Sequence, residues 1–304
     1  MNLPFLDDAS VAGLLDTAGV RDTLDEAFED LADGNSAIQK RLRTDCGGVK
    51  LSAMGGIWTA RGVAGTKSYT TVGGQFSFLL TLFDTVRNCP IALLEANELT
   101  RFRTAALSRL VARKAANQAP RKLALFGQGQ QGRAQAQALC EEFRLEEVAV
   151  VDPQGDDAWC ARMALRYGCR VTLTHAATAV AHADLVVTAT RSKSPVFDGS
   201  GLKPGALVIA LGTSLADGRE LDDTTLSRAS RVLVEWLPQS LEEAGDVVMG
   251  LATGALDRGR LADLPALYRG EARWREDGRD IVVFKTVGVG LSDVAAAWRA
   301  VRGL

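Results

Sequence analysis

Glycines placed between two apolar runs are the residues of this chain whose spacing most directly suggests chemistry. One apolar run ends at Phe126 and leads into Gly127-x-Gly129-x-x-Gly132. An alanine- and glutamine-rich stretch follows, and a second apolar run is closed by Asp152. The order predicts strand, tight turn, helix, strand and carboxylate, which is the layout of a dinucleotide-binding unit.

Each glycine has a physical role in such a unit. Gly127 allows the tight turn, Gly129 lets the backbone approach a pyrophosphate, and Gly132 lets helix and strand pack closely. The start of the helix offers free N–H groups and a positive dipole end to the phosphates. A plain glycine-rich turn is the alternative, but the flanking strands and the terminal acid favour the cofactor.

Asp152 directs the choice of cofactor. A carboxylate at this point accepts hydrogen bonds from both ribose hydroxyls of an adenosine and repels a 2′-phosphate. Pro153 follows where an arginine would be expected for NADPH. We therefore expect NAD, with NADP as the alternative.

Composition excludes several classes of protein. The 304 residues are 47% hydrophobic and 24% charged, which indicates a folded chain long enough for two domains. A net charge of −2 offers no basic surface to nucleic acid. The N-terminus shows no basic segment before an apolar one, and no apolar stretch is long enough to cross a bilayer, so no membrane association is expected.

Cysteine and histidine usage argues against a metal site. The five cysteines are scattered without a Cys-x-x-Cys pair, which favours a reducing cytoplasm over a disulfide framework. No cluster of partner acids or cysteines surrounds His175 or His182. We expect both at the surface or at a helix end, and no histidine base in the chemistry.

Apolar periodicity predicts a change of architecture along the chain. Residues 8–33 repeat at helical spacing, residues 38–95 form short β-type runs of a mostly antiparallel sheet, and a strong helix is expected over about 100–117. Three glycine pairs are expected to form the turns of that sheet: Gly47-Gly48, Gly55-Gly56 and Gly73-Gly74. Beyond Pro120, five or six strands alternate with helices, which predicts an α/β fold with a Rossmann-type, doubly wound parallel sheet.

Five separated segments resemble the ornithine cyclodeaminase/mu-crystallin family. Besides the glycine turn they are Thr-Arg-Phe-Arg-Thr-Ala-Ala (100–106), the stretch 210–223, Glu-Glu-Ala-Gly-Asp (242–246) and Val-Phe-Lys-Thr-Val-Gly (283–288). They occur in order over nearly the whole chain. The resemblance is closest to the ketimine (Δ1-pyrroline-2-carboxylate) reductases of the family.

The resemblance implies a domain plan and a class of ligand. It implies a Rossmann domain over 118–285 and an α+β substrate and dimerisation domain over 1–117, which the C-terminal helix, about 286–304, completes. It also implies a homodimer, a nicotinamide cofactor and small α-amino or α-imino acids. A β-rich run, apolar at many successive positions, adds support for a face that symmetric pairing would bury: Phe76, Phe78, Leu79, Leu80, Leu82 and Phe83.

The resemblance assigns the substrate carboxylate to basic side chains. Arg103, in the family's Thr-x-x-Arg-Thr segment, would pair with it bidentately, and Lys67 would reach the carboxylate and the carbonyl or imine carbon. Arg41 matches a third basic residue, but Lys40 and Arg43 leave open which of the three faces the site. Without the resemblance, Arg103 would be a solvated helix residue and Lys67 an edge-strand lysine.

Further contacts follow from the same resemblance. Thr104 would offer its hydroxyl and amide to the cofactor, and Val287 is expected at the substrate. The other expected cofactor contacts are Arg103, Gln130, Gln131, Thr188, Ala210, Leu211 and Thr286.

The chain departs from the family where the substrate pocket is shaped. The usual Met-Pro is Met54-Gly55, and Pro-x-Asn is replaced by Gly73-Gly74-Gln75. Ser214 stands where the cyclodeaminases carry an acid/base aspartate, as it does in ketimine reductases. A serine can orient a proton or a water but cannot be a general base; it can also serve as a helix cap.

We therefore interpret the chain as a cytoplasmic reductase of a small α-imino acid, with Lys67 and Ser214 as catalytic residues and no metal. The expected substrates are cyclic ketimines such as Δ1-pyrroline-2-carboxylate or Δ1-piperideine-2-carboxylate. The alternatives are an alanine-type amino-acid dehydrogenase, an ornithine cyclodeaminase, and a non-catalytic, crystallin-like NAD(P)-binding protein.

Overall fold

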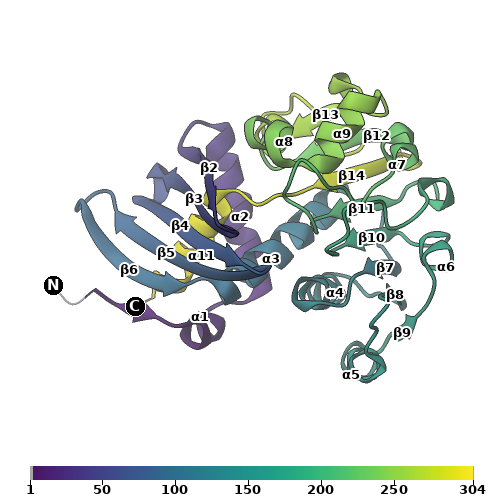
Figure 1. The fold of residues 1–304 in the computed structure, drawn as a ribbon, viewed down its shortest axis with the longest axis horizontal. Coiled ribbons are helices and arrows are strands. Elements are labelled where there is room, and N and C mark those ends of the chain that lie inside the picture. The colour runs from purple at the N-terminus through teal and green to yellow at the C-terminus, as the bar shows by residue number, and fades with distance from the viewer. Residues whose placement is uncertain (1–2, 304) are drawn as a thin grey trace. The chain divides into compact units, whose positions relative to one another are not determined.

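The computed structural model describes residues 3–303, which form two compact units (Figure 1). Unit 1 combines the chain up to Leu110 with the segment from Gly288 onward, and unit 2 comprises Val111–Val287. The chain therefore leaves unit 1, builds all of unit 2, and returns to complete unit 1.

Unit 1 is built on a six-stranded sheet with the order β1-β6-β5-β4-β3-β2. Neighbouring strands are antiparallel except β1 and β6, which are parallel. The strands are β1 (Phe5–Leu6), β2 (Ser36–Cys46), β3 (Val49–Trp58), β4 (Val63–Val72), β5 (Gln75–Asp84) and β6 (Cys89–Glu95). The helices are α1 (Asp8–Leu14), α2 (Thr17–Ala32), the 3-10 turn η1 (Thr59–Arg61), the first part of α3 (Asn97–Ala115) and α11 (Gly290–Val301).

Residue alternation gives this sheet a buried inner face. Met54, Lys67 and Leu80 lie in register across β3, β4 and β5, and all three are buried. Helix α11 packs across β2 to β5 and against α2. Trp298 of α11 meets the buried Trp58 edge-on, with ring centroids 5.3 Å apart. The C-terminal helix is thus part of the core of unit 1, as predicted.

One predicted turn is wrong. Gly55-Gly56 lies inside β3, where a Cβ on Gly56 would stand 2.8 Å from Leu291 Cα and a Cβ on Gly290 would stand 2.2 Å from the Gly55 carbonyl oxygen. The pair therefore makes room for α11 to approach the strand. The turn itself is η1 followed by Gly62, whose φ is 65°. Turns do form at the other two predicted glycine pairs, where all four glycines have positive φ: Gly47, Gly48, Gly73 and Gly74.

The outer face of the unit 1 sheet carries apolar side chains. We define it by five residues that are 37% to 64% exposed: Leu42, Leu51, Ile57, Leu79 and Phe83. A hollow of about 300 Å³ opens beside Ile57 and Phe83. The apolar run predicted in β5 is therefore divided between two faces, since Leu80 and Leu82 are fully buried on the inner one.

Unit 2 is an all-parallel, eight-stranded sheet with the order β13-β12-β14-β11-β10-β7-β8-β9. Its strands are β7 (Lys122–Phe126), β8 (Glu147–Val151), β9 (Arg170–Leu173), β10 (Leu185–Thr188), β11 (Leu207–Ala210), β12 (Ala229–Val234), β13 (Leu261–Asp263) and β14 (Ile281–Lys285). Its helices are α4 (Gln130–Glu142), α5 (Asp157–Tyr167), α6 (Ala176–Val180), η2 (Gly199–Gly201), α7 (Asp223–Arg228), α8 (Leu237–Glu243), α9 (Gly245–Thr253), η3 (Arg258–Arg260) and α10 (Leu264–Tyr268).

The topology of unit 2 places the glycine turn at a switch point. The chain begins at β7, steps outward to β8 and β9, and then crosses back to β10 on the other side of β7. Ligands of doubly wound sheets bind outside the carboxyl ends of the strands at such a reversal. The predicted fold class is confirmed. Two details differ: the sheet has eight strands rather than five or six, and α3 begins at Asn97 rather than about Thr100.

Candidate functional site

Lys67, Arg103 and Asp293 meet on the inner face of unit 1. Lys67 Nζ donates to Asp293 Oδ1 at 2.7 Å, and Arg103 Nε donates to the same oxygen at 3.0 Å. The three side chains are only 2%, 7% and 1% exposed. They come from β4, α3 and α11, so one sheet and two helices converge on a single carboxylate oxygen.

Arg41 is the member of the basic trio that joins this cluster. The pairing of β2 with β3 shifts register between Gln39 and Leu42, and a bulge of this kind re-aims a side chain. Arg41 donates to the Gly288 carbonyl at 2.9 Å and approaches Met54 Sδ at 3.4 Å. Lys40 is exposed on the same strand. The structure therefore favours Arg41 over Lys40 as the third basic residue of the site.

Gly288 also shapes the cluster through its missing side chain. Its φ is 77°, and a Cβ there would lie 2.8 and 3.0 Å from the terminal nitrogens of Arg103. The guanidinium thus uses Nε for Asp293 and lies with its two terminal nitrogens beside the bare backbone of Gly288. Such a pair of N–H groups has the fork geometry that binds a carboxylate bidentately.

The electrostatics of the cluster favour an anionic ligand. Three cations, Arg41, Lys67 and Arg103, accompany the one carboxylate of Asp293. The pKa of Lys67 is lowered from 10.5 to about 8, and burial is the largest cause. The positive charges of Arg103 and Arg41 also lower it, whereas the carboxylate of Asp293 opposes the decrease. A buried site with more positive than negative charge gains stability when it binds a carboxylate.

The glycine turn of unit 2 fits the phosphates of a dinucleotide. Gly127 has a φ of 92°, and a Cβ on Gly132 would stand 1.8 Å from the Gly127 carbonyl oxygen, so neither position accepts a larger residue. Gly129 caps the N-terminus of α4, is exposed, and would have no atom within 4 Å of an added Cβ. The backbone is therefore open where the motif predicts the pyrophosphate, and Gln130 and Gln131 follow as the first residues of α4.

Asp152 lies directly after β8 and is held by backbone amides. Its Oδ2 accepts from Gln128 N at 2.6 Å, and its Oδ1 accepts from Gln154 N at 2.8 Å. The Gln128 side chain in turn pairs with the backbone of Asp156, through bonds of 3.1 and 2.5 Å. Arg133 bonds the Gln128 carbonyl and the Asp156 carboxylate, each at 2.9 Å. The predicted ribose acid is thus rigidly joined to the glycine turn.

The remaining cofactor candidates of unit 2 lie at or just after the carboxyl ends of central strands. Two buried acids, Glu220 and Glu235, accept hydrogen bonds from this region. Glu220 accepts from Thr188 Oγ1 at 2.8 Å and from Gly212 N at 2.7 Å. Glu235 accepts from Thr286 Oγ1 at 2.6 Å and from Val287 N at 3.1 Å. Ala210 ends β11, and Leu211 N donates to the Thr188 carbonyl at 2.9 Å.

Thr104 lies within α3, and its hydroxyl donates to the Thr100 carbonyl at 2.7 Å. Because α3 begins at Asn97, the Thr104 amide is inside the helix, where backbone amides bond to the preceding turn.

Ser214 lies in the loop that follows β11. Lys285 Nζ donates to the carbonyl of the preceding residue, Thr213, at 2.8 Å and pairs with Asp246 Oδ2 at 2.8 Å. The other oxygen of Asp246 accepts from Glu220 N and Leu221 N at 2.8 and 2.9 Å. Lys285 and Asp246 are 0% and 1% exposed, so a fully buried ion pair fixes the loop on both sides of Ser214.

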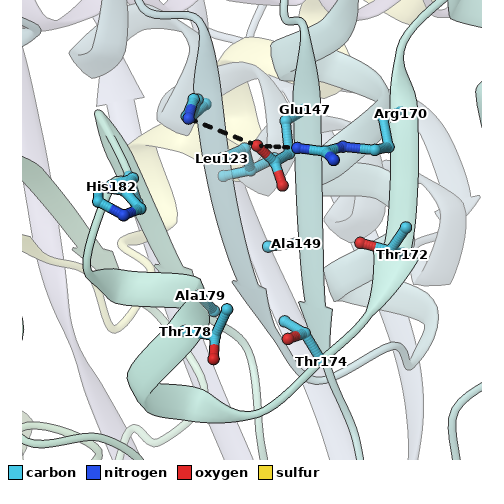
Figure 2. Close-up of a pocket in the computed structure, with 11 residues that line it drawn as sticks. Leu123, Glu147, Ala149, Arg170, Thr172, Thr174, Thr178, Ala179 and His182 are labelled. Atoms are coloured by element: carbon cyan, nitrogen blue, oxygen red, sulfur yellow. Dashed lines mark ion pairs between the residues drawn. The ribbon is translucent and has the colours of Figure 1, made fainter.

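A hollow on unit 2, shown in Figure 2, is a different feature. It has a volume of about 360 Å³ and lies along β7, β8 and β9, with Thr172, Thr178 and His182 among its lining. Glu147 pairs there with Lys122 at 3.6 Å and with Arg170 at 2.8 Å, and each of these residues begins its strand. None of the predicted cofactor residues lines it.

Within residues 3–303, no three His, Cys, Asp or Glu side chains gather as metal ligands. No helix in the same range is long and apolar enough to cross a membrane.

The sequence analysis assigned no role to the four acids that hold the candidate residues within unit 1 and within unit 2. Asp293, Glu220, Glu235 and Asp246 are all fully buried. Glu220 and Asp246 lay in segments that the family resemblance had marked, the stretch 210–223 and Glu-Glu-Ala-Gly-Asp (242–246), but neither acid was assigned a role. The available signal for Asp293 was an acid within the otherwise apolar C-terminal helix, because a buried charge requires a partner.

Comparison with known proteins identifies relatives along nearly the entire chain. The family model described as "Ornithine cyclodeaminase/mu-crystallin family" matches residues 5–302. The Δ1-pyrroline-2-carboxylate/Δ1-piperideine-2-carboxylate reductase of Azospirillum brasilense is 30% identical in an alignment that covers 97% of this chain and 94% of that protein.

Solved structures share the fold. A probable ornithine cyclodeaminase from Bordetella pertussis Tohama I is 42% identical, with a TM-score of 0.95 over 99% of this chain and 96% of that one. The Δ1-pyrroline-2-carboxylate reductase of Thermococcus litoralis, solved with NADH and L-proline, is 24% identical, with a TM-score of 0.92 over 98% and 96% of the two chains.

The buried ion pair of Lys285 and Asp246, which fixes the loop that carries Ser214, should be essential to the stability of unit 2. We expect Lys285→Met to lower the free energy of unfolding by about 3–5 kcal/mol, because it leaves Asp246 buried without its counter-ion. Lys193→Met breaks an ion pair with Asp217 that is 72% and 68% exposed, and should cost less than about 1 kcal/mol. Urea unfolding of both variants measures the difference; equal losses would contradict the prediction.

Proposed function

The chain belongs to the ornithine cyclodeaminase/mu-crystallin family, and from this premise we propose that it is an NADH-dependent reductase of a small α-imino acid. The proposed substrates are cyclic ketimines such as Δ1-pyrroline-2-carboxylate and Δ1-piperideine-2-carboxylate, which become the corresponding α-amino acids. The named activity of the Azospirillum relative and the ligands of the Thermococcus structure support this class of substrate.

One observation carries the proposal: Lys67 and Arg103 share a single buried carboxylate oxygen in unit 1, and Arg41 adds a third positive charge that acts on Lys67. The α-carboxylate is the group that α-amino, α-keto and α-imino acids share. Arg103 would bind it through its two terminal nitrogens, and Lys67 and Arg41 would add positive charge. The grip fixes the position of the neighbouring C2 atom, which is where reduction occurs.

The residues of unit 2 would hold the dinucleotide. The turn from Gly127 to Gly132 would bind the pyrophosphate, Asp152 the adenosine ribose, and the loops after β10, β11 and β14 the remainder. When bound, a reduced nicotinamide supplies the hydride that converts the C=N carbon to a C–H carbon.

Proton management separates this proposal from its nearest rival. An imine is basic enough to arrive protonated, so Ser214 or a bound water needs only to orient or replace a proton. Cyclodeamination of ornithine requires a general base, which a serine cannot supply. The description of the Bordetella protein as a probable ornithine cyclodeaminase makes that activity the comparison to run. Turnover of a keto acid with ammonia would instead favour an alanine-type dehydrogenase, and dinucleotide binding without any turnover a crystallin-like role.

Substitution of Arg103 and Ser214 tests the mechanism. We expect Arg103→Ala to lower kcat/KM for ketimine reduction on the order of a hundredfold or more, because the carboxylate loses its bidentate grip. Ser214→Ala should retain measurable turnover, since the substrate carries its own proton. Initial rates of NADH oxidation against cyclic and linear imino acids measure both effects.

The matched control is Arg101→Ala, two residues away on α3, where Arg101 pairs with Glu98 and should leave turnover near the parent value. The proposal is wrong if the parent releases ammonia from ornithine and forms proline. It is also wrong in its assignment of the clamp if Arg103→Ala reduces ketimines at the full rate.

Asp152 should make NADH the preferred cofactor. Its carboxylate is held in place by two backbone amides and would repel a 2′-phosphate, so we expect kcat/KM to be higher for NADH by about tenfold or more. Asp152→Asn should narrow that ratio, because it keeps the size of the side chain and removes its charge. A preference of the parent protein for NADPH would overturn the assignment.

We also propose that the protein is a homodimer paired through the outer face of unit 1. An exposed apolar sheet face favours association, and symmetric pairing would bury Leu42, Leu51, Ile57, Leu79 and Phe83. Sedimentation at micromolar concentration should give the mass of two chains, and Ile57→Lys should shift the equilibrium toward one. A parent protein that sediments as a monomer would contradict this proposal.

The five free cysteines suit a cytoplasmic location, which we propose on that ground alone.

A further inference from the structure

We propose that Asp293 is the positioning residue of the substrate site: one shared oxygen of its carboxylate orients Arg103 and keeps Lys67 in its cationic form. The inference rests on the proposed function for its effect on catalysis. Its structural basis is independent of the substrate, because it concerns only how three buried side chains of unit 1 hold one another.

The geometry assigns both tasks to the same atom. Oδ1 accepts from Lys67 Nζ at 2.7 Å and from Arg103 Nε at 3.0 Å. By occupying Nε, Asp293 fixes the plane of the guanidinium and leaves its terminal nitrogens beside Gly288. Without this acceptor, none of these contacts would fix the rotation of the Arg103 guanidinium about its side chain.

The charge on Lys67 depends on the same carboxylate. The groups that face its Nζ are Asp293 from α11, Arg103 from α3, Arg41 from β2, the Thr100 hydroxyl at 3.2 Å and the Phe78 ring at 5.0 Å. Burial and the two arginines disfavour the ammonium form, and Asp293 is the only group in this set whose charge favours it. With a pKa of about 8, Lys67 is mostly protonated at pH 7 and loses its proton as the pH rises through 8.

The second oxygen of Asp293 makes a charge-only substitution possible. Oδ2 is buried and accepts no hydrogen bond from the described residues. Asp293→Asn can therefore keep its carbonyl oxygen at the Oδ1 position and place its amide NH2 group where Oδ2 stands, without meeting a donor. The variant retains both acceptor contacts at Oδ1, removes the negative charge, and breaks no hydrogen bond at Oδ2.

The direction of the effect follows from the sign of that charge. Loss of a neighbouring anion destabilises the ammonium form, so the pKa of Lys67 falls by about one unit or more in Asp293→Asn. For a decrease of one unit, the protonated fraction is unchanged near pH 6 and is lower by about tenfold at pH 9. The ratio of variant to parent kcat/KM should follow this curve, and any titration of the substrate cancels in the ratio.

The experiment combines two measurements on the full-length protein. The 13Cε shift of Lys67, assigned by its absence in Lys67→Arg, is titrated in the parent and in Asp293→Asn; the chain has only eight lysines. The kcat/KM for a cyclic ketimine is then measured from pH 6 to pH 9. We expect the Lys67 titration to move to lower pH and the activity ratio to fall as the pH rises.

Two controls separate charge from packing. Ser292→Ala removes, from the same turn of α11, a buried hydroxyl that has no hydrogen-bond partner among residues 3–303, and should move neither measurement. In the Lys67→Arg background, which has no titrating group at position 67, Asp293→Asn should change activity by a factor that does not depend on pH.

Each outcome decides the inference. An unchanged Lys67 titration, or an activity ratio that is flat with pH, would overturn it and leave Asp293 a structural residue. If the parent reduces no ketimine, the proposed function fails, but the Lys67 titration still tests what Asp293 does. Circular dichroism shows whether Asp293→Asn folds. If it does not fold, Asp293→Glu, which keeps the charge, is measured in its place. The pKa of Lys67 in Asp293→Glu should stay near that of the parent, and a clear decrease would overturn the inference.

Discussion

The organisation of unit 1 depends on one constraint: a charge removed from water must meet an opposite charge or several hydrogen bonds. Lys67 and Arg103 are buried in a wall formed by β4 and α3, and the carboxylate that compensates them is on α11. This requirement explains why the C-terminal segment returns to the first unit. It also explains why β3 carries Gly55 and Gly56, since only a bare backbone lets α11 approach closely enough.

Unit 2 meets the same constraint with three more buried acids. Glu220, Glu235 and Asp246 each accept from backbone amides at the carboxyl ends of strands, where a parallel sheet leaves its loops. Carboxylates with two lone-pair-bearing oxygens can join loops that are far apart in sequence, and these three connect the segments after β10, β11, β12 and β14. The loops that would surround a cofactor are therefore rigid without being part of a helix or strand.

Short sequence patterns correctly predicted the features whose residues lie close together along the chain. The glycine turn, the strands on both sides of it and Asp152 lie within a single βα unit, so spacing alone was sufficient to place them. The turn predicted at Gly55-Gly56 was wrong because a glycine pair in a sequence indicates only that a Cβ is not tolerated. The close approach of α11 to β3 requires glycine for the same reason that a turn does. The choice among Lys40, Arg41 and Arg43 stayed open because a bulge interrupts the alternation of β2. Asp293 was missed because its partners lie far away along the chain.

That separation has a consequence for how the protein is made. Asp293 follows Lys67 by 226 residues and Arg103 by 190. While a ribosome synthesises the chain, both cations emerge long before their counter-ion, and the whole of unit 2 is translated in between. The inner face of unit 1 must therefore remain open to water throughout this interval, and its closure is a late, long-range step of high contact order. Unit 2 has all of its own sheet before that moment and is free to fold first.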